Sequence, residues 1–300
     1  QSMSQPRFGR MIPAMVTPFD ENRELDLDKA QALAARLVDG GSDSLIINGT
    51  TGESPTVFYP QKIELFRAVV EAVGDRVPVI ANVGDNCTAD TVYFAQDAAK
   101  QGVDGFMCVV PYYNKPPQEG LYRHFKTIAD STDMPIILYN IPGRCSINME
   151  GDTTLRLAHN CDNVVAIKEA SGNISQVAKI AQLCGDELNI YSGNDDQVVP
   201  LLSLGGKGVI SVVSNVKPEL VHNCCKAWFE GDPKTACKLQ LEILPLADAL
   251  FCEVNPIPVK YAMNVLGWEA GPCRLPLVEP SDAHKEKIEQ ALETEGLIQE

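Results

Sequence analysis

The chain has 300 residues, of which 45% are hydrophobic and 22% charged, so it is long enough to bury a large core. Its 40 acidic residues outnumber 25 basic ones, and the net charge of −15 argues against a nucleic-acid partner or an anionic membrane surface. No segment has the length of a transmembrane span and the first residues lack a secretory pattern, so we expect a cytoplasmic protein. Gln1-Ser2-Met3 is typical of the remnant of a cleaved expression tag.

The cysteines and histidines do not predict a metal site. The 10 cysteines are scattered, Cys224-Cys225 is the only close pair and no C-x-x-C occurs, so neither a zinc site nor a disulfide framework is indicated. The 4 histidines fall in predicted helices or at helix ends, whereas a catalytic metal needs several ligands converging at one pocket. We therefore expect no metal.

Short apolar runs recur at intervals of roughly 20 to 35 residues, and a helical pattern follows each of them. This alternation is typical of repeated βα units with a parallel sheet. We count eight units, which predicts a closed α/β fold, the (β/α)8 or TIM barrel, rather than an open sheet. In chain order the predicted strands are 11–17, 44–48, 77–83, 105–110, 135–140, 164–168, 188–192 and 208–213.

Turn and cap residues mark the helices between the strands. Gly40-Gly41 is placed to end the first helix, Pro60 to open the second and Thr88 to cap the third. After the eighth strand, helical patterns cover 218–229, 233–250, 258–266 and a last helix capped by Ser281. We predict a catalytic barrel over 8–230 and a C-terminal helical bundle over 231–300 that serves packing or subunit contact. Within it, Lys260 is predicted to be a solvated or snorkelling side chain.

Lys168 is the most informative residue of the sequence. It closes the apolar run Val164-Val165-Ala166-Ile167, which is typical of a strand buried on both faces. Burial disfavours the ammonium form of a lysine, and the neutral amine is the form that attacks a carbonyl. The alternative is a strand-end lysine that pairs with Glu169 or another neighbour. We interpret Lys168 as a candidate nucleophile.

Polar residues and glycines follow several other predicted strands, at the end where barrel enzymes carry their active sites. Gly49-Thr50-Thr51-Gly52 offers backbone N–H groups and hydroxyls suited to a carboxylate. Tyr139 is placed to move protons to and from a carbinolamine oxygen, with Thr50 and Tyr113 extending the relay. Arg144 suits a bidentate contact with a second carboxylate. Each feature also has a simpler interpretation when it is taken alone. The loop can be an ordinary βα turn, Tyr139 a core or interface residue, and Arg144 an exposed loop charge.

The chain resembles the dihydrodipicolinate synthase family, within the pyruvate-dependent lyases that also include N-acetylneuraminate lyase. The resemblance runs from about Gly9 to Leu277 and rests on strand-end motifs in the family's order. Those motifs are Asn48 to Ser54, Pro111 to Asn114, Tyr139 to Arg144, Lys168 and Ser192 to Asp196, together with Gly208 to Val212 and Arg274-Leu275-Pro276.

The resemblance implies that Lys168 forms a Schiff base with pyruvate and that Thr50, Tyr113 and Tyr139 form the proton relay. In the family, the tyrosine matching Tyr113 reaches in from a neighbouring subunit, which implies a dimer, commonly paired into a tetramer. The implied substrate contacts are Thr51 to the pyruvate carboxylate, Arg144 to the carboxylate of aspartate semialdehyde, and main-chain contacts from Gly193 and Ile210.

The implied reaction condenses pyruvate with aspartate 4-semialdehyde to 4-hydroxy-tetrahydrodipicolinate, the first committed step of diaminopimelate and lysine synthesis. No cofactor is needed, because the iminium itself is the electron sink. The alternative is a related 2-keto-acid (sugar-acid) aldolase or dehydratase that uses the same lysine; Arg144 and the paired Thr50-Thr51 favour the synthase. A non-catalytic barrel is disfavoured because no expected catalytic residue type is missing.

Two departures from the family pattern concern the site. Where the family usually has Arg-Thr-Gly, this chain has Arg144-Cys145-Ser146 and lacks a glycine that could relax the loop. Asn86, Asp90 and Tyr112 match residues of a cleft that binds inhibitory lysine in many members, while Tyr59 stands where a histidine is common. These four residues are a possible allosteric lysine site.

Overall fold

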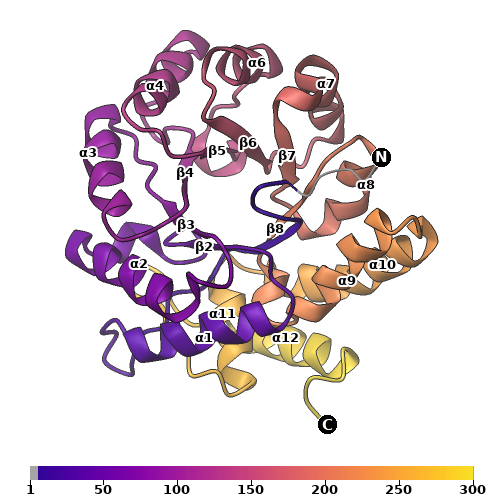
Figure 1. The fold of residues 1–300 in the computed structure, drawn as a ribbon. Helices are drawn as coiled ribbons and strands as arrows, with labels where there is room; N and C mark the ends of the chain where they lie inside the picture. The colour runs from indigo at the N-terminus through magenta and orange to yellow at the C-terminus, as the bar shows by residue number, and fades with distance from the viewer. Residues whose placement is uncertain (1–5, 300) are drawn as a thin grey trace.

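The computed structural model describes residues 6–299 and contains a closed barrel of eight parallel strands inside a ring of helices (Figure 1). Gln1-Ser2-Met3, the predicted tag remnant, lies outside the described residues. The strands are hydrogen-bonded in the order β1-β8-β7-β6-β5-β4-β3-β2, and a bridge between Ala14 and Ile46 closes β1 onto β2. Their bounds are β1 Met11–Pro13, β2 Leu45–Ile47, β3 Val79–Asn82, β4 Gly105–Val109, β5 Ile136–Asn140, β6 Val164–Glu169, β7 Asn189–Ser192 and β8 Gly208–Ser211. The (β/α)8 prediction is confirmed.

All eight predicted strands are present, but β1 and β8 end earlier than predicted. After β1, the N–H of Val16 donates to Asn215 Oδ1 at 3.1 Å instead of to a neighbouring strand. After β8, the N–H groups of Val212 and Val213 donate to Asp195 Oδ2 at 2.9 and 3.1 Å. Side chains distant in sequence therefore end these strands, which their apolar patterns alone cannot indicate.

Two of the three residues predicted to begin or end helices between the strands do so. Gly40 is the C-cap of the first helix and Pro60 lies in the first turn of the second, as predicted. The third helix has Cys87 as its N-cap, so the prediction that Thr88 caps it is wrong. The helices are α1 Leu27–Asp39, α2 Tyr59–Val73, α3 Thr88–Ala99, α4 Gln118–Asp130, α5 Pro142–Cys145, α6 Gly151–Asn160, α7 Ile174–Cys184, α8 Val198–Ser203, α9 Pro218–Phe229, α10 Pro233–Leu250, α11 Ile257–Val265 and α12 Asp282–Thr294.

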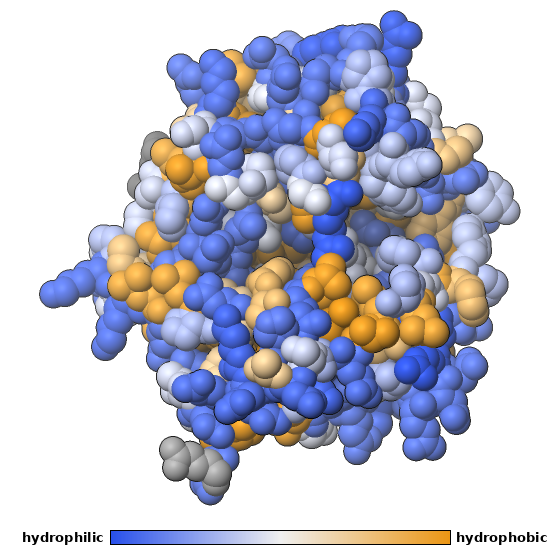
Figure 2. All heavy atoms as spheres, turned by 180° about the vertical axis from the view of Figure 1, so that it is seen from behind, coloured by the Kyte–Doolittle hydropathy of each residue, from blue (hydrophilic) through white to orange (hydrophobic). Residues whose placement is uncertain are grey.

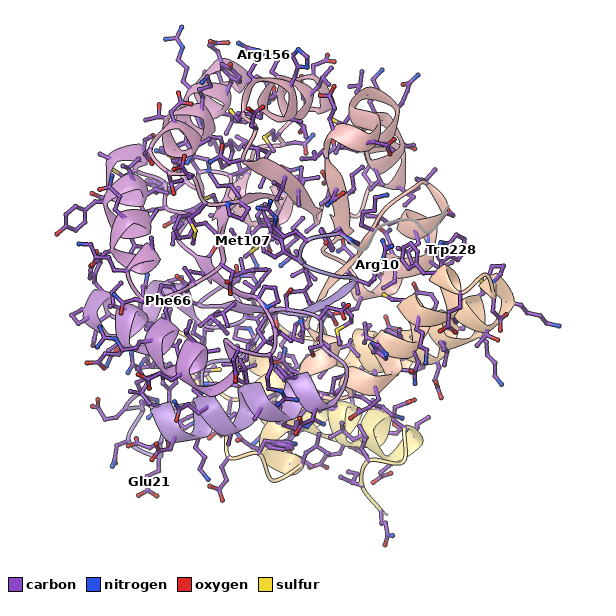
Figure 3. All side chains as sticks on the ribbon, viewed as in Figure 1. Arg10, Glu21, Phe66, Met107, Arg156 and Trp228 are labelled. Carbon is purple, nitrogen blue, oxygen red and sulfur yellow. The ribbon has the colours of Figure 1, made fainter. Side chains whose placement is uncertain are left out.

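Two layers of buried apolar side chains make up the core. The smaller layer fills the barrel and includes Met107, Ile137 and Ala166, while the larger layer, which includes Phe66, lies between strands and helices. Figure 3 places the label of Met107 among the strands and that of Phe66 beside α2. Because successive side chains of a strand face opposite sides, the residue two positions after Ala166 also faces the barrel interior. That residue is Lys168.

The C-terminal helices α9 to α12 pack against one another at one side of the barrel (Figure 1). The helices predicted over 218–229 and 233–250 are confirmed residue for residue. The prediction of a solvated or snorkelling Lys260 is wrong: this side chain is 2% exposed, and its Nζ lies 2.7 Å from Glu53 Oε2. The domain boundary at residue 230 stays a prediction.

The face shown in Figure 2 is mostly hydrophilic and carries separate hydrophobic patches. Large apolar or aromatic side chains that stay exposed include Phe58, Tyr93, Tyr113, Leu241 and Leu275. In the part of the chain that the structure describes, no helix is both long and apolar enough to cross a bilayer.

We expect the protein to lose stability in weak acid because of His124 on α4. Its ring is buried beside Phe125, its Nδ1 lies 2.7 Å from the Thr88 hydroxyl, and burial lowers its pKa from 6.5 to about 4. Between these pH values the unfolded chain takes up a proton that the folded protein does not. The histidine therefore lowers the free energy of unfolding by up to about 3 kcal/mol as pH falls through that window.

Urea titrations of wild type and His124→Asn at pH 7 and pH 4.5 measure this contribution. The stability difference between the two pH values should shrink in His124→Asn and stay at the wild-type value in His159→Asn, since His159 is exposed. An unchanged pH difference in His124→Asn would contradict the prediction.

Candidate active site

Lys168 and Tyr139 lie opposite each other on neighbouring strands at the carboxyl end of the barrel. The register of β5 and β6 pairs Tyr139 with Lys168. Both residues are buried, at 4% and 6% exposed, and the Lys168 Nζ lies 4.1 Å from the centroid of the Tyr139 ring. The predicted burial of Lys168 at a strand end is therefore confirmed.

Glu169, the alternative partner of Lys168, points away from it. As the next residue along β6, it faces the opposite side of the strand. Its Oε1 accepts hydrogen bonds from Asn140 Nδ2, the Ser171 N–H and Gln176 Nε2 at 3.1, 3.1 and 3.2 Å. Burial raises the pKa of the Glu169 carboxyl, and these hydrogen bonds oppose that rise. Glu169 therefore belongs to a separate polar network behind the barrel wall.

Gly193, after β7, leaves room for the lysine. A Cβ at this position would lie 2.6 Å from the Cβ of Ala170 and 3.2 Å from the Lys168 Cε. Any larger residue would push on the lysine side chain, so glycine allows the backbone to approach the candidate nucleophile. Ile210, on β8, faces the same barrel interior.

Asp195 fixes the chain between β7 and β8. Its buried carboxylate accepts from the Ser211 hydroxyl at 2.5 Å and from two backbone N–H groups that follow β8. Burial raises the pKa of Asp195, while these hydrogen bonds and the positive charge of Lys168 lower it. The carboxylate thus anchors the backbone that follows β8.

The loop after β2 presents Thr50 and Thr51. Asn48 and Glu53, at its two ends, adopt left-handed backbone with φ of 66° and 59°. The Glu53 N–H donates to the Thr50 carbonyl at 2.9 Å, and Thr51 Oγ1 accepts from Asn255 Nδ2 at 2.9 Å. Within residues 6–299, the N–H groups of Thr50 and Thr51 donate no hydrogen bond to the protein. Such groups suit an anionic ligand.

A cavity of about 440 Å³ lies at the mouth and is lined by Thr50, Tyr139 and Arg144, among others. Arg144 is exposed on α5, and its Nη2 donates to the Asn255 carbonyl at 2.8 Å. Ser146, the C-cap of α5, has a φ of 64°. The family glycine missing at this position is thus replaced by a serine in left-handed backbone, the conformation that favours glycine.

Tyr113 is not brought to this cavity by its own chain. It is 88% exposed with a φ of 75°, while its neighbour Tyr112 lines the cavity. Of the predicted relay, Thr50 and Tyr139 therefore meet at the cavity and Tyr113 does not.

The residues of the possible lysine site lie beside this cavity. Tyr59 and Asp90 line a neighbouring cavity of about 370 Å³, and the Asn86 side chain donates to the Tyr112 carbonyl at 3.0 Å. Lys62 lines both cavities, and burial lowers its pKa.

Asn255 is a site residue that the sequence reasoning missed. It contacts Thr51 through its side chain and Arg144 through its carbonyl, so it joins the two candidate carboxylate-binding positions. The available signal was Asn255-Pro256, a break between the helical patterns of the C-terminal region.

A buried lysine beside a tyrosine at the mouth of a (β/α)8 barrel is typical of the class of α/β-barrel enzymes, with Lys168 as the candidate active-site lysine. Residues 7–295 match the model of the dihydrodipicolinate synthetase family. Over 292 residues the chain is 51% identical to the 4-hydroxy-tetrahydrodipicolinate synthase of Moorella thermoacetica, covering 97% of this chain and 100% of that protein. The chain belongs to the dihydrodipicolinate synthetase family.

Solved structures of relatives share the whole fold. The enzyme from Cyanidioschyzon merolae with lysine bound has a TM-score of 0.96 and 44% identity, covering 98% of this chain and 100% of that one. The chloride-inhibited dihydrodipicolinate synthase from Acinetobacter baumannii complexed with pyruvate has a TM-score of 0.94 and 34% identity, covering 97% and 100%.

Proposed function

We propose that the protein condenses pyruvate with aspartate 4-semialdehyde to 4-hydroxy-tetrahydrodipicolinate, in the pathway to diaminopimelate and lysine. It is a lyase of the lysine Schiff-base class. The observation that carries the proposal is the buried Lys168 beside Tyr139 in a chain 51% identical to a relative named for this reaction.

The chemistry begins with attack of the Lys168 amine on C2 of pyruvate. Water leaves the resulting carbinolamine to give an iminium, and loss of a C3 proton gives an enamine. The enamine carbon attacks the aldehyde of the second substrate. The amine of that substrate then attacks C2, which closes the ring and releases Lys168. The Tyr139 hydroxyl carries protons to and from the carbinolamine oxygen.

The loop after β2 binds the carboxylate of pyruvate. Among residues 6–299, the N–H groups of Thr50 and Thr51 have no protein acceptor, and Thr51 adds a hydroxyl held by Asn255. Gly193 and Ile210 contribute main-chain contacts from β7 and β8. These groups fix C2 of pyruvate next to the lysine.

A second copy of the chain completes the relay with Tyr113. The supporting observation is that this tyrosine is 88% exposed and lies outside the cavity of its own chain. The protein then functions as a homo-oligomer, with pairs of subunits arranged as a dimer of dimers.

Free lysine is proposed to regulate this enzyme through Tyr59, Asn86, Asp90 and Tyr112. Asp90 offers a carboxylate for an amino group of the ligand, while the cationic Lys62 shares the cavity and weakens such binding. Adding L-lysine to the turnover assay tests this site. A turnover rate that does not change with lysine concentration would reject the proposal that lysine regulates the enzyme here.

We expect Arg144→Ala to weaken use of the second substrate while sparing pyruvate. Loss of a charge-assisted contact to its carboxylate should lower kcat/KM for aspartate semialdehyde by about 30- to 100-fold. Steady-state kinetics with each substrate varied in turn measure the split. Arg123→Ala, at an exposed arginine bonded to Glu119, is the matched control. An equal rise in KM for pyruvate would contradict the assignment.

The proposed function is tested by turnover of pyruvate with aspartate semialdehyde, coupled to a dihydrodipicolinate reductase and followed as nicotinamide oxidation. Pyruvate alone is the blank. Turnover supports the synthase. No turnover, with borohydride still trapping pyruvate on Lys168, would reject this second substrate and favour a sugar-acid aldolase or dehydratase.

A further inference from the structure

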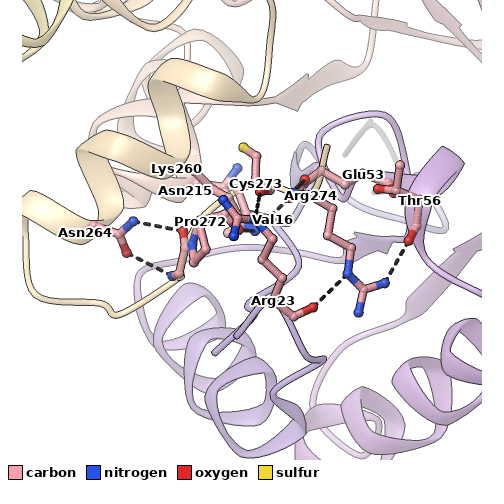
Figure 4. A network of polar contacts seen from close by, with 11 residues as sticks. Val16, Arg23, Glu53, Thr56, Asn215, Lys260, Asn264, Pro272, Cys273 and Arg274 are labelled. Atoms are coloured by element: carbon pink, nitrogen blue, oxygen red, sulfur yellow. Dashed lines mark hydrogen bonds and ion pairs between the residues drawn. The ribbon is translucent and has the colours of Figure 1, made fainter. Parts of the chain in front are cut away.

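Glu53 and Lys260 form a buried ion pair next to the loop after β2 (Figure 4). Their side chains are 0% and 2% exposed, and Lys260 Nζ lies 2.7 Å from Glu53 Oε2. The same Nζ donates to the Pro272 carbonyl at 3.2 Å and lies 3.9 Å from the centroid of the Phe19 ring. The cost of desolvating two charges offsets much of their attraction, so a buried ion pair adds little to the stability of a protein. A role other than stability therefore has to explain why this pair lies next to the loop.

Arg274 holds the other oxygen of the same carboxylate. Its backbone N–H donates to Glu53 Oε1 at 2.8 Å, and its Nη1 donates to the Thr56 carbonyl at 2.7 Å. Its Nε donates to the Arg23 carbonyl at 2.9 Å (Figure 4). Both oxygens of Glu53 are therefore bound by the C-terminal region, more than 200 residues away in the sequence.

The conformation of Glu53 depends on these contacts. Its φ of 59° lies in the left-handed region, which costs free energy for a non-glycine residue and persists when surrounding contacts hold it. In this conformation its N–H donates to the Thr50 carbonyl at 2.9 Å. The Lys260–Glu53 pair thereby constrains the backbone that carries the N–H groups of Thr50 and Thr51.

We propose that Lys260, acting through Glu53, is a positioning residue that aims the N–H groups of Thr50 and Thr51 at the carboxylate of pyruvate. This inference rests on the proposed function. It gives the C-terminal helices a part in the active site, because α11 supplies Lys260 and the segment after it supplies Arg274.

Lys260→Met tests the proposal, since it keeps the length of the side chain and removes the charge. The readout is the pyruvate concentration that gives half-maximal borohydride trapping on Lys168, measured by intact mass without a second substrate. We expect this concentration to rise about tenfold or more, with full trapping restored at high pyruvate because Lys168 is intact. A folded Lys260→Met within twofold of wild type would overturn the proposal.

Two further variants separate positioning from general stability. Lys217→Met breaks the 2.9 Å ion pair between Lys217, the N-cap of α9, and Glu295, the C-cap of α12. It should lower thermal stability and leave the pyruvate dependence unchanged. If Lys260→Met does not fold, Glu53→Gln with Lys260→Met avoids the unpaired buried charge and carries the same test. A wild-type pyruvate dependence in that double variant would also overturn the proposal.

The test distinguishes this inference from the proposed function. Trapping of pyruvate by wild type does not depend on the aldehyde, so a different second substrate leaves the comparison intact. Wild type that traps no pyruvate at any concentration would reject the Schiff-base function and this inference together.

Discussion

Replacing Lys168 with alanine should abolish both turnover and borohydride trapping of pyruvate. The amine supplies the covalent bond to C2, and this variant removes that amine from its place beside Tyr139. We expect a loss of at least about 10⁴-fold in kcat, corresponding to about 5 kcal/mol of transition-state stabilisation. Steady-state turnover and the intact mass of the borohydride-treated protein measure the two losses independently.

Lys179→Ala is the matched control for this experiment. Lys179 is an exposed lysine on α7, the helix that follows β6, so its removal should leave turnover and trapping unchanged. Near-normal activity in Lys168→Ala would contradict the Schiff-base assignment, since a residual amine elsewhere would then be carrying the reaction.

Tyr139→Phe should lower kcat by about 10² to 10³-fold while the protein stays folded. The ring, whose centroid lies 4.1 Å from the Lys168 Nζ, is retained, and the variant removes only the hydroxyl. Loss of the proton carrier should slow both the formation of the iminium and the later release of Lys168 from the product. A time course in which borohydride is added at increasing times after pyruvate measures the rate of iminium formation directly.

Tyr122→Phe provides the comparison for Tyr139→Phe. The Tyr122 hydroxyl, on α4, accepts from Asn160 Nδ2, on α6, at 3.1 Å, and Tyr122 is not one of the residues that line the cavity. This control should match wild type in both kcat and the rate of trapping. If Tyr139→Phe also stays within threefold of wild type, the proton relay must run through another group.

The proximity of Lys168 and Tyr139 can be predicted from the local sequence. Each residue ends an apolar run, and consecutive parallel strands of a barrel lie side by side, so residues at the same height meet. The register confirms this, because Tyr139 pairs directly with Lys168. The period-2 alternation from Ala166 also explains why Lys168, and not Glu169, faces the interior.

The contacts of the C-terminal region with the site cannot be predicted from the local sequence. Lys260 lies on an amphipathic helical pattern in which a lysine ordinarily reaches solvent. Its burial results from the carboxylate of Glu53, and the contact of Asn255 with Thr51 joins positions similarly far apart in the chain. A linear pattern carries no information on which side chain distant in sequence will be the partner.

The sequence by itself determined the eight βα units, the strand-end location of the candidate site and the helices after the barrel. These features depend on hydrophobic periodicity and turn chemistry, which act between residues close in the chain. Only the tertiary structure decided where β1 and β8 end, that Lys260 is buried against Glu53, and that Asn255 joins Thr51 to Arg144. Those outcomes depend on desolvation and hydrogen-bond satisfaction between segments that meet only when the barrel closes.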